Sequence, residues 1–326
     1  MAPTAVELVS LRALSSACVH LVAGAGALIR DVAGPHRLTS AAALGVVAKH
    51  DDTPQTVADR HSQRHIVSGL RRAHPTFAHV ALVGEEGGEE ADAAWAHAPV
   101  ADLTLLDSVW SADEDVHVPA ADVAVFVDPL DGTKEFTRGR YAFVTVLVGI
   151  TVRGEPAIGV IGEPYADDGA GRILCGGSVR GAFELRPANG SPRPLAPPAD
   201  DDAGRTAAVV SLSRSGGAVH EALAQLEAKG LVTARIPAGG AGYKAACVVD
   251  GRAALWLFPR AGTSRWDTCA AQALIEAVGG ALVDRTGARI RYDAASTQHG
   301  NALGVVACRD RSVMPAVVAV TASLRE

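Results

Sequence analysis

The sequence is poor in aromatic residues and shows no excess of positive charge. Phe, Trp and Tyr make up 4% of the 326 residues, so the core must rest on Ala, Val, Leu and Ile. The 30 Lys and Arg residues are scattered and are outnumbered by 36 Asp and Glu, which gives a formal net charge of −6. This balance argues against nucleic-acid binding through a basic surface.

Paired cysteines and a long hydrophobic run are also lacking. The five cysteines lie far apart and form no C-x-x-C pair, which indicates reduced, mostly buried thiols and a cytosol-like compartment. Residues 13–29 are uncharged but number only 17 and include two Ser, one His and two Gly. Apolar residues there recur at helical spacing, which predicts a packed amphipathic helix and no membrane span. They are Leu11, Leu14, Cys18, Leu21, Ala25 and Leu28. We therefore expect a cytoplasmic protein, with an organelle address left open.

The order of predicted elements indicates two layered halves. At about 150 residues per domain the length suggests two domains, and 48% hydrophobic residues supply an ample core. Apolar runs separated by Gly-containing turns make the chain β-rich up to about residue 186. The segment 187–204, rich in Pro, Gly and Asp, is the predicted linker. We expect an α+β domain over residues 1–190 and an α/β domain over residues 200–326, each with helices layered on sheets.

Five acidic residues lie at the ends of predicted strands or at the starts of predicted helices. They are Asp59 and Asp267, which open two helices, Glu85, which follows one strand, and Asp128 and Asp131, which follow another. Each has an ordinary structural explanation. A first-turn carboxylate favours the helix dipole by ~0.3–1 kcal/mol, Glu85 fits an exposed charge, and the sequence D-P-L-D-G fits a type I turn. Their common position next to apolar elements suggests instead that they meet at the mouth of a sheet.

If the five carboxylates converge, they require cations. Two like charges about 4 Å apart repel by about 4 kcal/mol at an effective dielectric constant near 20. Oxygen ligands without His or Cys favour Mg²⁺, Mn²⁺ or Ca²⁺ over zinc. The stiff residue Pro129 lets Asp128, the Leu130 carbonyl and Asp131 face one region, and the backbone N–H groups of Gly132 and Thr133 follow at a predicted helix start, where a phosphate oxygen could bind. Metal and phosphate together suit displacement at phosphorus by metal-activated water.

Three motifs in this order resemble the inositol monophosphatase superfamily. They are G-E-E at 84–86, D-P-L-D-G-T at 128–133 and W-D at 266–267, and the resemblance spans residues from about 55 to about 307. Members of that superfamily are magnesium-dependent phosphatases, typically lithium-sensitive, with a layered αβαβα sandwich. The resemblance therefore implies this fold, this cofactor and a small phosphate ester as substrate.

The residues after the second motif narrow the resemblance. D-P-L-D-G-T-K-E-F, with Lys134 and Glu135, is similar to the 3′(2′),5′-bisphosphate nucleotidases, whereas inositol monophosphatases usually have D-G-T-x-N-F. The segment 239–251 and the segment 257–268, L-F-P-R-A-G-T-S-R-W-D-T, are similar to the same branch. The implied reaction is hydrolysis of the 3′-phosphate of adenosine 3′,5′-bisphosphate to AMP and phosphate, which removes a by-product of sulfur metabolism.

The resemblance also implies roles for individual residues. Two or three Mg²⁺ ions would be held by Glu85, Asp128, the carbonyl of Leu130, Asp131 and Asp267. Asp59 and Thr133 would deprotonate the attacking water. Substrate would be bound by Gly132, Thr133, Ser213, Gly240 and Lys244, although without the resemblance Lys244 is more simply an exposed helix lysine. From the predicted exposure of Asp131 we expect Asp131→Ala to abolish turnover without disturbing the fold.

One departure bears on the substrate. The nucleotidase branch usually has S/T-R-S-H, but here S-R-S is followed by Gly216, and His220 lies four residues further on. A missing imidazole removes one contact to a nucleotide, so two alternatives stay open. One is an inositol polyphosphate 1-phosphatase or inositol monophosphatase activity, and the other is an inactive nucleotide or metal sensor. The oligomeric state is not indicated.

Overall fold

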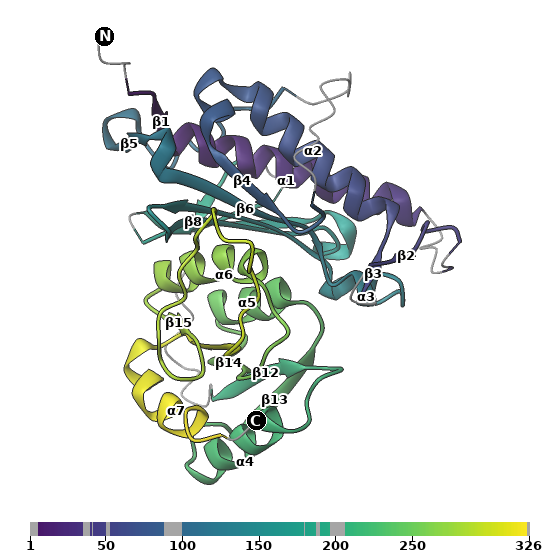
Figure 1. Cartoon of the computed structure of the whole chain (residues 1–326), viewed down its shortest axis with the longest axis vertical. Helices are drawn as coiled ribbons and strands as arrows, with labels where there is room; N and C mark the ends of the chain where they lie inside the picture. Colours follow the sequence, from purple (N-terminus) through teal and green to yellow (C-terminus); the bar gives the residue numbers. More distant parts are fainter. Residues whose placement is uncertain are drawn as a thin grey trace.

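A seven-stranded sheet carries the first part of the chain in the computed structural model (Figure 1). The structure describes residues 6–34, 40, 42–49, 53–87, 100–178, 180–186, 190–195 and 206–324. The strand order is β11-β10-β9-β8-β7-β6-β4, and every neighbouring pair is antiparallel except β4 and β6. The strands are β4 (Ala81–Gly84), β6 (Val123–Asp131), β7 (Thr145–Val152), β8 (Glu155–Glu163), β9 (Arg172–Gly177), β10 (Gly181–Leu185) and β11 (Arg193–Pro194).

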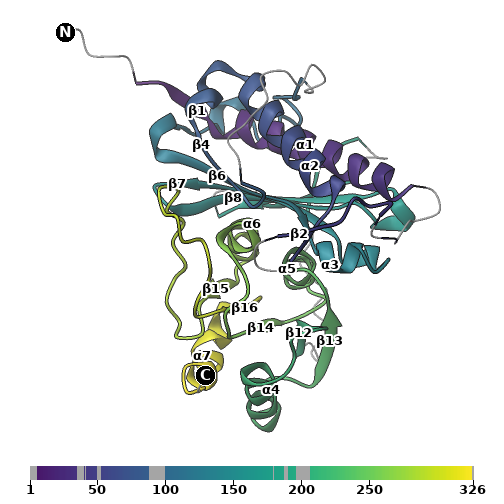
Figure 2. The ribbon, with the colours of Figure 1, turned by 45° about the vertical axis from the view of Figure 1, so that its right-hand side comes forward.

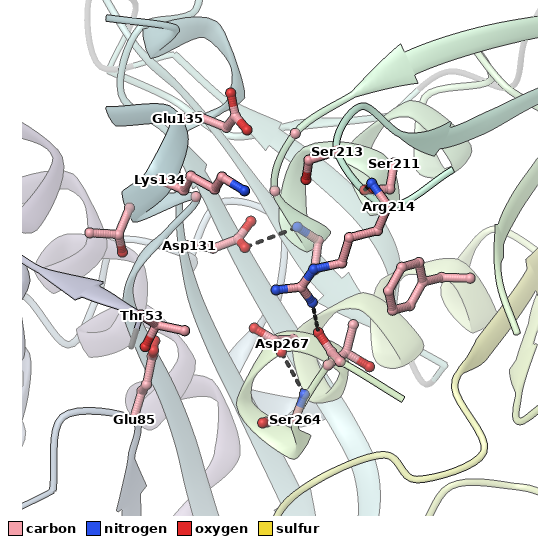
Figure 3. Close-up of a pocket in the computed structure, with 18 of the residues that line it drawn as sticks. Thr53, Glu85, Asp131, Lys134, Glu135, Ser211, Ser213, Arg214, Ser264 and Asp267 are labelled. Carbon is pink, nitrogen blue, oxygen red and sulfur yellow. Dashed lines mark hydrogen bonds between the residues drawn. The ribbon is translucent and has the colours of Figure 1, made fainter. Parts of the chain in front are cut away.

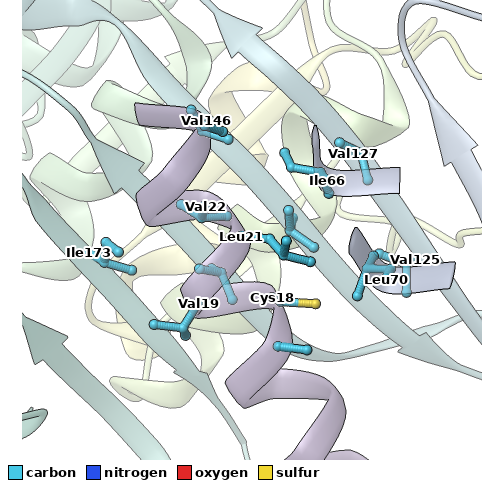
Figure 4. Packing of buried hydrophobic residues seen from close by; sticks show 14 of the residues in the cluster. Cys18, Val19, Leu21, Val22, Ile66, Leu70, Val125, Val127, Val146 and Ile173 are labelled. Carbon is cyan, nitrogen blue, oxygen red and sulfur yellow. The ribbon is translucent and has the colours of Figure 1, made fainter. Parts of the chain in front are cut away.

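Two long helices cover one face of this sheet. Helix α1 (Leu11–Ala33) begins at Ser10, whose side chain accepts a hydrogen bond from the backbone N–H of Ala13, and α2 (Val57–Ala73) packs beside it. Figure 4 shows apolar side chains of both helices meeting those of the strands. The labelled residues are Cys18, Val19, Leu21 and Val22 of α1, Ile66 and Leu70 of α2, and Val125, Val127, Val146 and Ile173 of the sheet.

The predicted first helix is confirmed as a packed helix. Within the described residues, α1 is the one helix whose length and apolar composition would also allow it to cross a membrane. Of its most apolar window, however, 61% is buried inside the fold. Hydrophobicity in α1 is thus accounted for by packing on the sheet.

The second part of the chain forms a five-stranded sheet in the order β13-β12-β14-β16-β15. Strand β12 runs parallel to β13 and β14, whereas β16 is antiparallel to β14 and β15. The strands are β12 (Ala207–Ser211), β13 (Ala234–Ala238), β14 (Leu255–Phe258), β15 (Ala281–Val283) and β16 (Val305–Cys308). Helices α4 (Ala218–Ala228) and α7 (Met314–Thr321) pack on its outer face.

Helices α5 (Ala241–Val249) and α6 (Arg265–Ala277) lie between the two sheets (Figure 2). The layers are therefore helices, sheet, helices, sheet and helices, which confirms the predicted αβαβα sandwich. Strand β6 is buried at all nine positions because both faces of its sheet are covered. That explains the uninterrupted apolar run from Val123 to Val127.

Short elements complete the described part. Strand β1 (Leu8–Ser10) pairs with β5 (His117–Pro119), and β2 (Val47–Ala48) pairs with β3 (Pro54–Gln55). The remaining helices are α3 (Thr133–Phe136) and the 3₁₀ turns η1 (Pro75–His79), η2 (Ala112–Glu114), η3 (Ala120–Asp122), η4 (Tyr141–Phe143), η5 (Asp167–Gly169) and η6 (Arg311–Val313). All five cysteines are free and buried, as predicted.

The predicted linker falls largely outside the described residues, since 187–189 and 196–205 are not described. Strand β11 (Arg193–Pro194) of the seven-stranded sheet lies inside this segment, while the other strands of the two sheets lie on either side of it, at 81–185 and 207–308. The division into domains at 190 and 200 stays a prediction.

Candidate active site

The segment Asp128-Pro129-Leu130-Asp131 is the end of strand β6. The register of β6 with β7 shifts between Asp128, opposite Leu147, and Asp131, opposite Thr145. Such a bulge accommodates a proline, which has no N–H to donate to the ladder. All four residues belong to the strand and are buried, so the explanation of this segment as a type I turn is wrong.

Asp131 is held by the start of helix α5. Its Oδ1 accepts a hydrogen bond from the Ala241 N–H at 2.9 Å, and its Oδ2 accepts from the Gly242 N–H and from the Thr145 hydroxyl, each at 2.7 Å. A Cβ on Gly240, which has φ of 62°, would lie 2.7 Å from Asp131 Oδ2, so this approach requires glycine. Asp131 is 7% exposed, and its predicted surface position is wrong.

Asp267 and Asp59 both belong to capping boxes at helix starts. The N–H of Ser264, the N-cap of α6, donates to Asp267 Oδ2 at 2.5 Å. The N–H of Thr56, the N-cap of α2, donates to Asp59 Oδ2 at 2.7 Å. Their explanation as helix-start residues is therefore correct. It does not conflict with a site role, because each carboxylate has a second oxygen.

Asp128, Asp131 and Asp267 form a triad whose ligand oxygens all lie within 4.8 Å of one another. Burial raises the pKa of Asp128 well above its ordinary value, and the charges of Glu85, Asp131 and Asp267 raise it further. Burial raises the pKa of Asp267 to about 7, with the charges of Asp131 and Glu85 adding to the effect. The ionised triad is thus costly by itself, and a divalent cation would offset that cost. This all-oxygen donor set fits Mg²⁺ or Mn²⁺.

Glu85 lies next to the triad but has a cation of its own. Lys49 Nζ is 2.7 Å from Glu85 Oε1 and 2.7 Å from Glu86 Oε1. Burial raises the pKa of Glu85, and Lys49 opposes that rise. Lys49 leads out of strand β2 and was not predicted as a site residue, because nothing in the local sequence places the β2–β3 hairpin over Glu85.

Thr133 and Asp59 meet beside the triad. The Thr133 hydroxyl is 2.9 Å from Asp59 Oδ1 and 3.0 Å from the carbonyl oxygen of Leu130. Burial raises the pKa of Asp59 to about 6, against hydrogen bonds from Thr56 and Thr133 that lower it. A hydroxyl that donates to a carboxylate of near-neutral pKa can pass its proton to that carboxylate while it takes one from a neighbouring water.

Glu85, Asp131 and Thr133 line one side of a cavity of about 660 Å³, and Asp267 lines it from α6. Asp59, Asp128 and Leu130 are not among its lining residues. The side opposite Asp131 comes from the second sheet and its helices (Figure 3). The predicted residues Gly132, Thr133, Ser213, Gly240 and Lys244 all line it. So do Lys49, Thr53, Lys134, Glu135, Ser211, Arg214, Phe258 and Trp266, which the predicted site did not include.

Lys244 is buried, so its explanation as an exposed helix lysine is wrong. Its ammonium group donates to the Gly240 carbonyl and lies 5.9 Å from the ring centre of Trp256. Burial lowers its pKa, whereas Asp131 and Asp267 oppose that fall. Gly216 and His220 do not line the cavity, and the Cβ position of Gly216 has no atom within 4 Å among those described.

Five alternating layers with a carboxylate-lined cavity are the arrangement implied by the resemblance of the sequence to the inositol monophosphatase superfamily. Residues 10–322 match the sequence profile of the inositol monophosphatase family. The chain is 32% identical over 317 residues to the 3′(2′),5′-bisphosphate nucleotidase 1 of Dictyostelium discoideum, covering 90% of this chain and 91% of that protein. It is also 32% identical over 313 residues to the human protein of the same name, covering 91% of each. The chain therefore belongs to the inositol monophosphatase family.

A solved structure supports the fold independently. The extragenic suppressor protein suhB of Bartonella henselae superposes with a TM-score of 0.66 at 19% identity, covering 95% of this chain and 99% of that one. At this identity the likeness concerns the fold alone.

Proposed function

We propose that the chain is a Mg²⁺-dependent phosphatase that hydrolyses the 3′-phosphate of adenosine 3′,5′-bisphosphate to AMP and phosphate. The observation that carries the proposal is the triad Asp128, Asp131 and Asp267 lying beside the Asp59–Thr133 pair, with Asp131, Asp267 and Thr133 lining one cavity. A cation site next to a proton relay is what activation of water for attack on a phosphate ester needs.

The choice of a nucleotide rests on the relatives and on the cavity. Both nucleotidases named above are matched along nine-tenths of their length. The cavity volume lies in the range usual for small-molecule sites. Its far side offers hydroxyl and cationic groups from Ser211, Ser213, Arg214 and Lys244, which suit a substrate with a second anionic group.

In the proposed reaction a water oxygen forms a bond to phosphorus while the bond from phosphorus to the 3′-oxygen breaks. Bound Mg²⁺ would neutralise phosphate charge and lower the pKa of the attacking water. The hydroxyl of Thr133 passes the proton of that water to Asp59, whose pKa of about 6 suits a base near neutral pH. The departing 3′-oxygen takes a proton from solvent.

The remaining predicted ligands are part of the proposal. Glu85 and the carbonyl of Leu130 would complete the coordination of two or three ions, and Glu85 would then share its carboxylate between a cation and Lys49. Gly132 and Gly240 would let the phosphate approach the backbone closely, because neither carries a side chain.

An inositol phosphate is the second candidate substrate, because Gly216 leaves the cavity without the imidazole usual in the nucleotidase branch. An inactive sensor is disfavoured, since the triad and the Asp59–Thr133 pair are both assembled.

Phosphate release from three substrates tests the proposal. We expect adenosine 3′,5′-bisphosphate to be hydrolysed with a kcat/KM at least about tenfold above those of inositol 1,4-bisphosphate and inositol 1-phosphate, a difference of about 1.4 kcal/mol in transition-state binding. Activity should vanish with a chelator and return with excess Mg²⁺. A preference of that size for an inositol phosphate would replace the nucleotide by the second candidate, and no release from any of the three would support the sensor.

A further inference from the structure

Four cationic side chains line the cavity, and they differ in their partners. Lys49 pairs with Glu85 and Glu86, and Lys244 is buried with its ammonium group on a backbone carbonyl. Lys134 follows Thr133 directly and belongs to the side that carries the carboxylates. Arg214 alone of the four comes from the loop after β12, on the far side of the cavity.

Arg214 is held in place without being neutralised. Its Nη1 donates to the carbonyl oxygen of Gly262 at 3.1 Å, and its backbone N–H donates to the Ser211 hydroxyl at 3.2 Å. Throughout the described ranges, no carboxylate lies within ion-pair distance of its guanidinium group. Figure 3 shows the side chain extending into the cavity from the loop that carries Ser213.

Gly262 makes room for this guanidinium group. A Cβ at position 262 would lie 2.6 Å from Arg214 Nη1, and its φ of 129° is a conformation that other residues rarely adopt. Gly262 also lies two residues before Ser264, the N-cap of α6, whose N–H binds Asp267. The Arg214–Gly262 hydrogen bond therefore joins the far side of the cavity to the helix that carries one triad carboxylate.

The chemistry of Arg214 fits a phosphate. A guanidinium group has five N–H donors in a planar fork, and the hydrogen bond to Gly262 uses only one of them. The remaining donors can bind two oxygens of one phosphate at once. The Ser213 hydroxyl lines the cavity beside it.

We propose that Arg214 binds the phosphate that is not hydrolysed and so determines the preference of this enzyme for bisphosphorylated over monophosphorylated substrates. This inference rests on the proposed function, because it takes the reacting phosphate to lie at the Asp128/Asp131/Asp267 triad. Position 216 is glycine and lies outside the cavity lining. In this chain the contact to the phosphate that is not hydrolysed therefore comes from the guanidinium group of Arg214.

Two nucleotides that differ only in the 5′-phosphate provide the test. The kcat/KM for adenosine 3′,5′-bisphosphate and for adenosine 3′-monophosphate is measured with wild type, Arg214→Met, Arg214→Lys and Lys134→Met. For Arg214→Met we expect the kcat/KM to fall by about 10- to 100-fold with the bisphosphate and by less than about 3-fold with the monophosphate. The reason is that the substitution removes a charged hydrogen bond to the 5′-phosphate, which only the bisphosphate carries. Arg214→Lys should recover part of the loss, because it restores the charge without the fork.

Lys134→Met is the matched control, because it removes a positive charge from the same cavity on the side of the triad. It should reduce the kcat/KM for both substrates by similar factors. Melting curves of each variant separate these effects on kcat/KM from loss of folding. We expect the Arg214 variants to fold, because the exposed Arg214 side chain fills no core position.

The outcomes distinguish this inference from the function on which it rests. A wild-type enzyme that hydrolyses both nucleotides equally well overturns the role of Arg214 and leaves the proposed function standing, whereas a wild-type enzyme that hydrolyses neither overturns the proposed function. A wild-type preference for the bisphosphate that persists unchanged in folded Arg214→Met overturns the role of Arg214 and leaves the proposed function standing. A loss that is equal for both nucleotides in Arg214→Met would also overturn that role, because it would mark a general effect of charge.

Discussion

Thr133 illustrates how single atoms join distant parts of this chain. It opens α3 directly after β6, while Asp59, 74 residues earlier, lies in the first turn of α2. The hydroxyl oxygen is the only atom of Thr133 that contacts both Asp59 and the Leu130 carbonyl in the described hydrogen-bond network. A replacement that keeps the shape of Thr133 and removes this oxygen isolates its contribution.

We predict that Thr133→Val lowers kcat by about 10²- to 10⁴-fold, the range expected for loss of general-base assistance, with little change in KM. Thr133→Ser should retain most of the activity, because it keeps the hydroxyl. Steady-state kinetics at saturating Mg²⁺ measures both. Thr137→Val, which removes a hydroxyl that donates to the Lys134 carbonyl, is the control and should behave as wild type. Near-wild-type kcat in Thr133→Val would exclude the proton relay.

Asp131 is a proposed cation ligand, and it also accepts hydrogen bonds from the start of α5. Different substitutions separate these two roles. We predict that Asp131→Asn and Asp131→Ala both abolish Mg²⁺-dependent turnover. The asparagine variant keeps one side-chain oxygen, which can accept from one of the N–H groups of Ala241 and Gly242. The alanine variant leaves both of these N–H groups without an acceptor from this side chain. It should therefore lose an additional ~1–3 kcal/mol of unfolding free energy, contrary to the expectation from sequence that the fold is undisturbed.

Urea denaturation with a chelator present measures that difference. Asp113→Ala, which changes an exposed aspartate in η2, should leave stability within about 0.5 kcal/mol of wild type. Equal stabilities for the two Asp131 variants would show that the start of α5 does not depend on this carboxylate.

At the scale of elements, α1 and α2 pack closely because a glycine faces a histidine. A Cβ on Gly24 of α1 would lie 2.2 Å from Nε2 of His65 on α2, so the imidazole occupies the groove left by the glycine. Burial lowers the pKa of His65 to about 4, and the nearby His20 lowers it further. The folded state thus holds His65 neutral at pH values where the unfolded chain binds a proton.

This difference predicts a pH dependence of stability. Because the folded pKa is below the unfolded value of 6.5, the unfolding free energy should fall as the pH drops from about 6.5 towards 4. His65 is partly exposed, so we expect its share to be about 1–2 kcal/mol after allowing for solvent screening. Urea midpoints at pH 7.5 and 4.5 should differ less in His65→Gln than in wild type. His61→Gln, an exposed histidine of the same helix, should leave the difference unchanged.

Helix α5 is anchored at both ends to the seven-stranded sheet. Its first turn binds Asp131 of β6, and just past its last residue Asp250 Oδ2 is 2.9 Å from Arg172 Nη2 of β9. Arg172 also pairs with Glu163 at the end of β8. The second anchor therefore fixes the direction in which α5 presents its N–H groups to Asp131.

We predict that Asp250→Asn weakens Mg²⁺ binding by about 3- to 10-fold, the range expected for coupling through a packed element. Calorimetric titration with Mg²⁺ gives the affinity independently of turnover. Asp122→Asn is the control, because it removes the ion pair between Asp122 of η3 and Arg153, which directly follows β7, where Nε lies 2.9 Å from Oδ2. This variant should bind Mg²⁺ as wild type does. An unaltered affinity in Asp250→Asn would mean that the first anchor alone positions Asp131.

The sequence predicted the elements better than their contacts. The apolar run of β6 and the acids that follow it are local features, so the end of β6 was predicted as the centre of the site. The anchoring of Asp131 by α5 was missed, because it depends on packing between segments 110 residues apart. Arg214 was missed for the same reason, since its place is set by Gly262, 48 residues away.

At the scale of the whole molecule, the triad connects layers of the sandwich. Asp128 and Asp131 belong to β6 in the seven-stranded sheet, and Asp267 belongs to α6, which packs between the two sheets. Repulsion within the triad therefore opposes the packing of α6 against β6. A cation bound by all three carboxylates would reverse this effect.

We therefore predict that Mg²⁺ stabilises the entire fold. A ligand at 100 times its Kd adds about 2.7 kcal/mol to the unfolding free energy if it binds only the folded state, which for a chain of this length corresponds to a rise in Tm of about 4 °C. Thermal unfolding with a chelator, and then with excess Mg²⁺, measures the rise. NaCl at matched ionic strength should not produce it, because screening alone does not bridge the carboxylates. Asp131→Asn should show little or no rise, and a full rise in that variant would place the stabilising ion away from the triad.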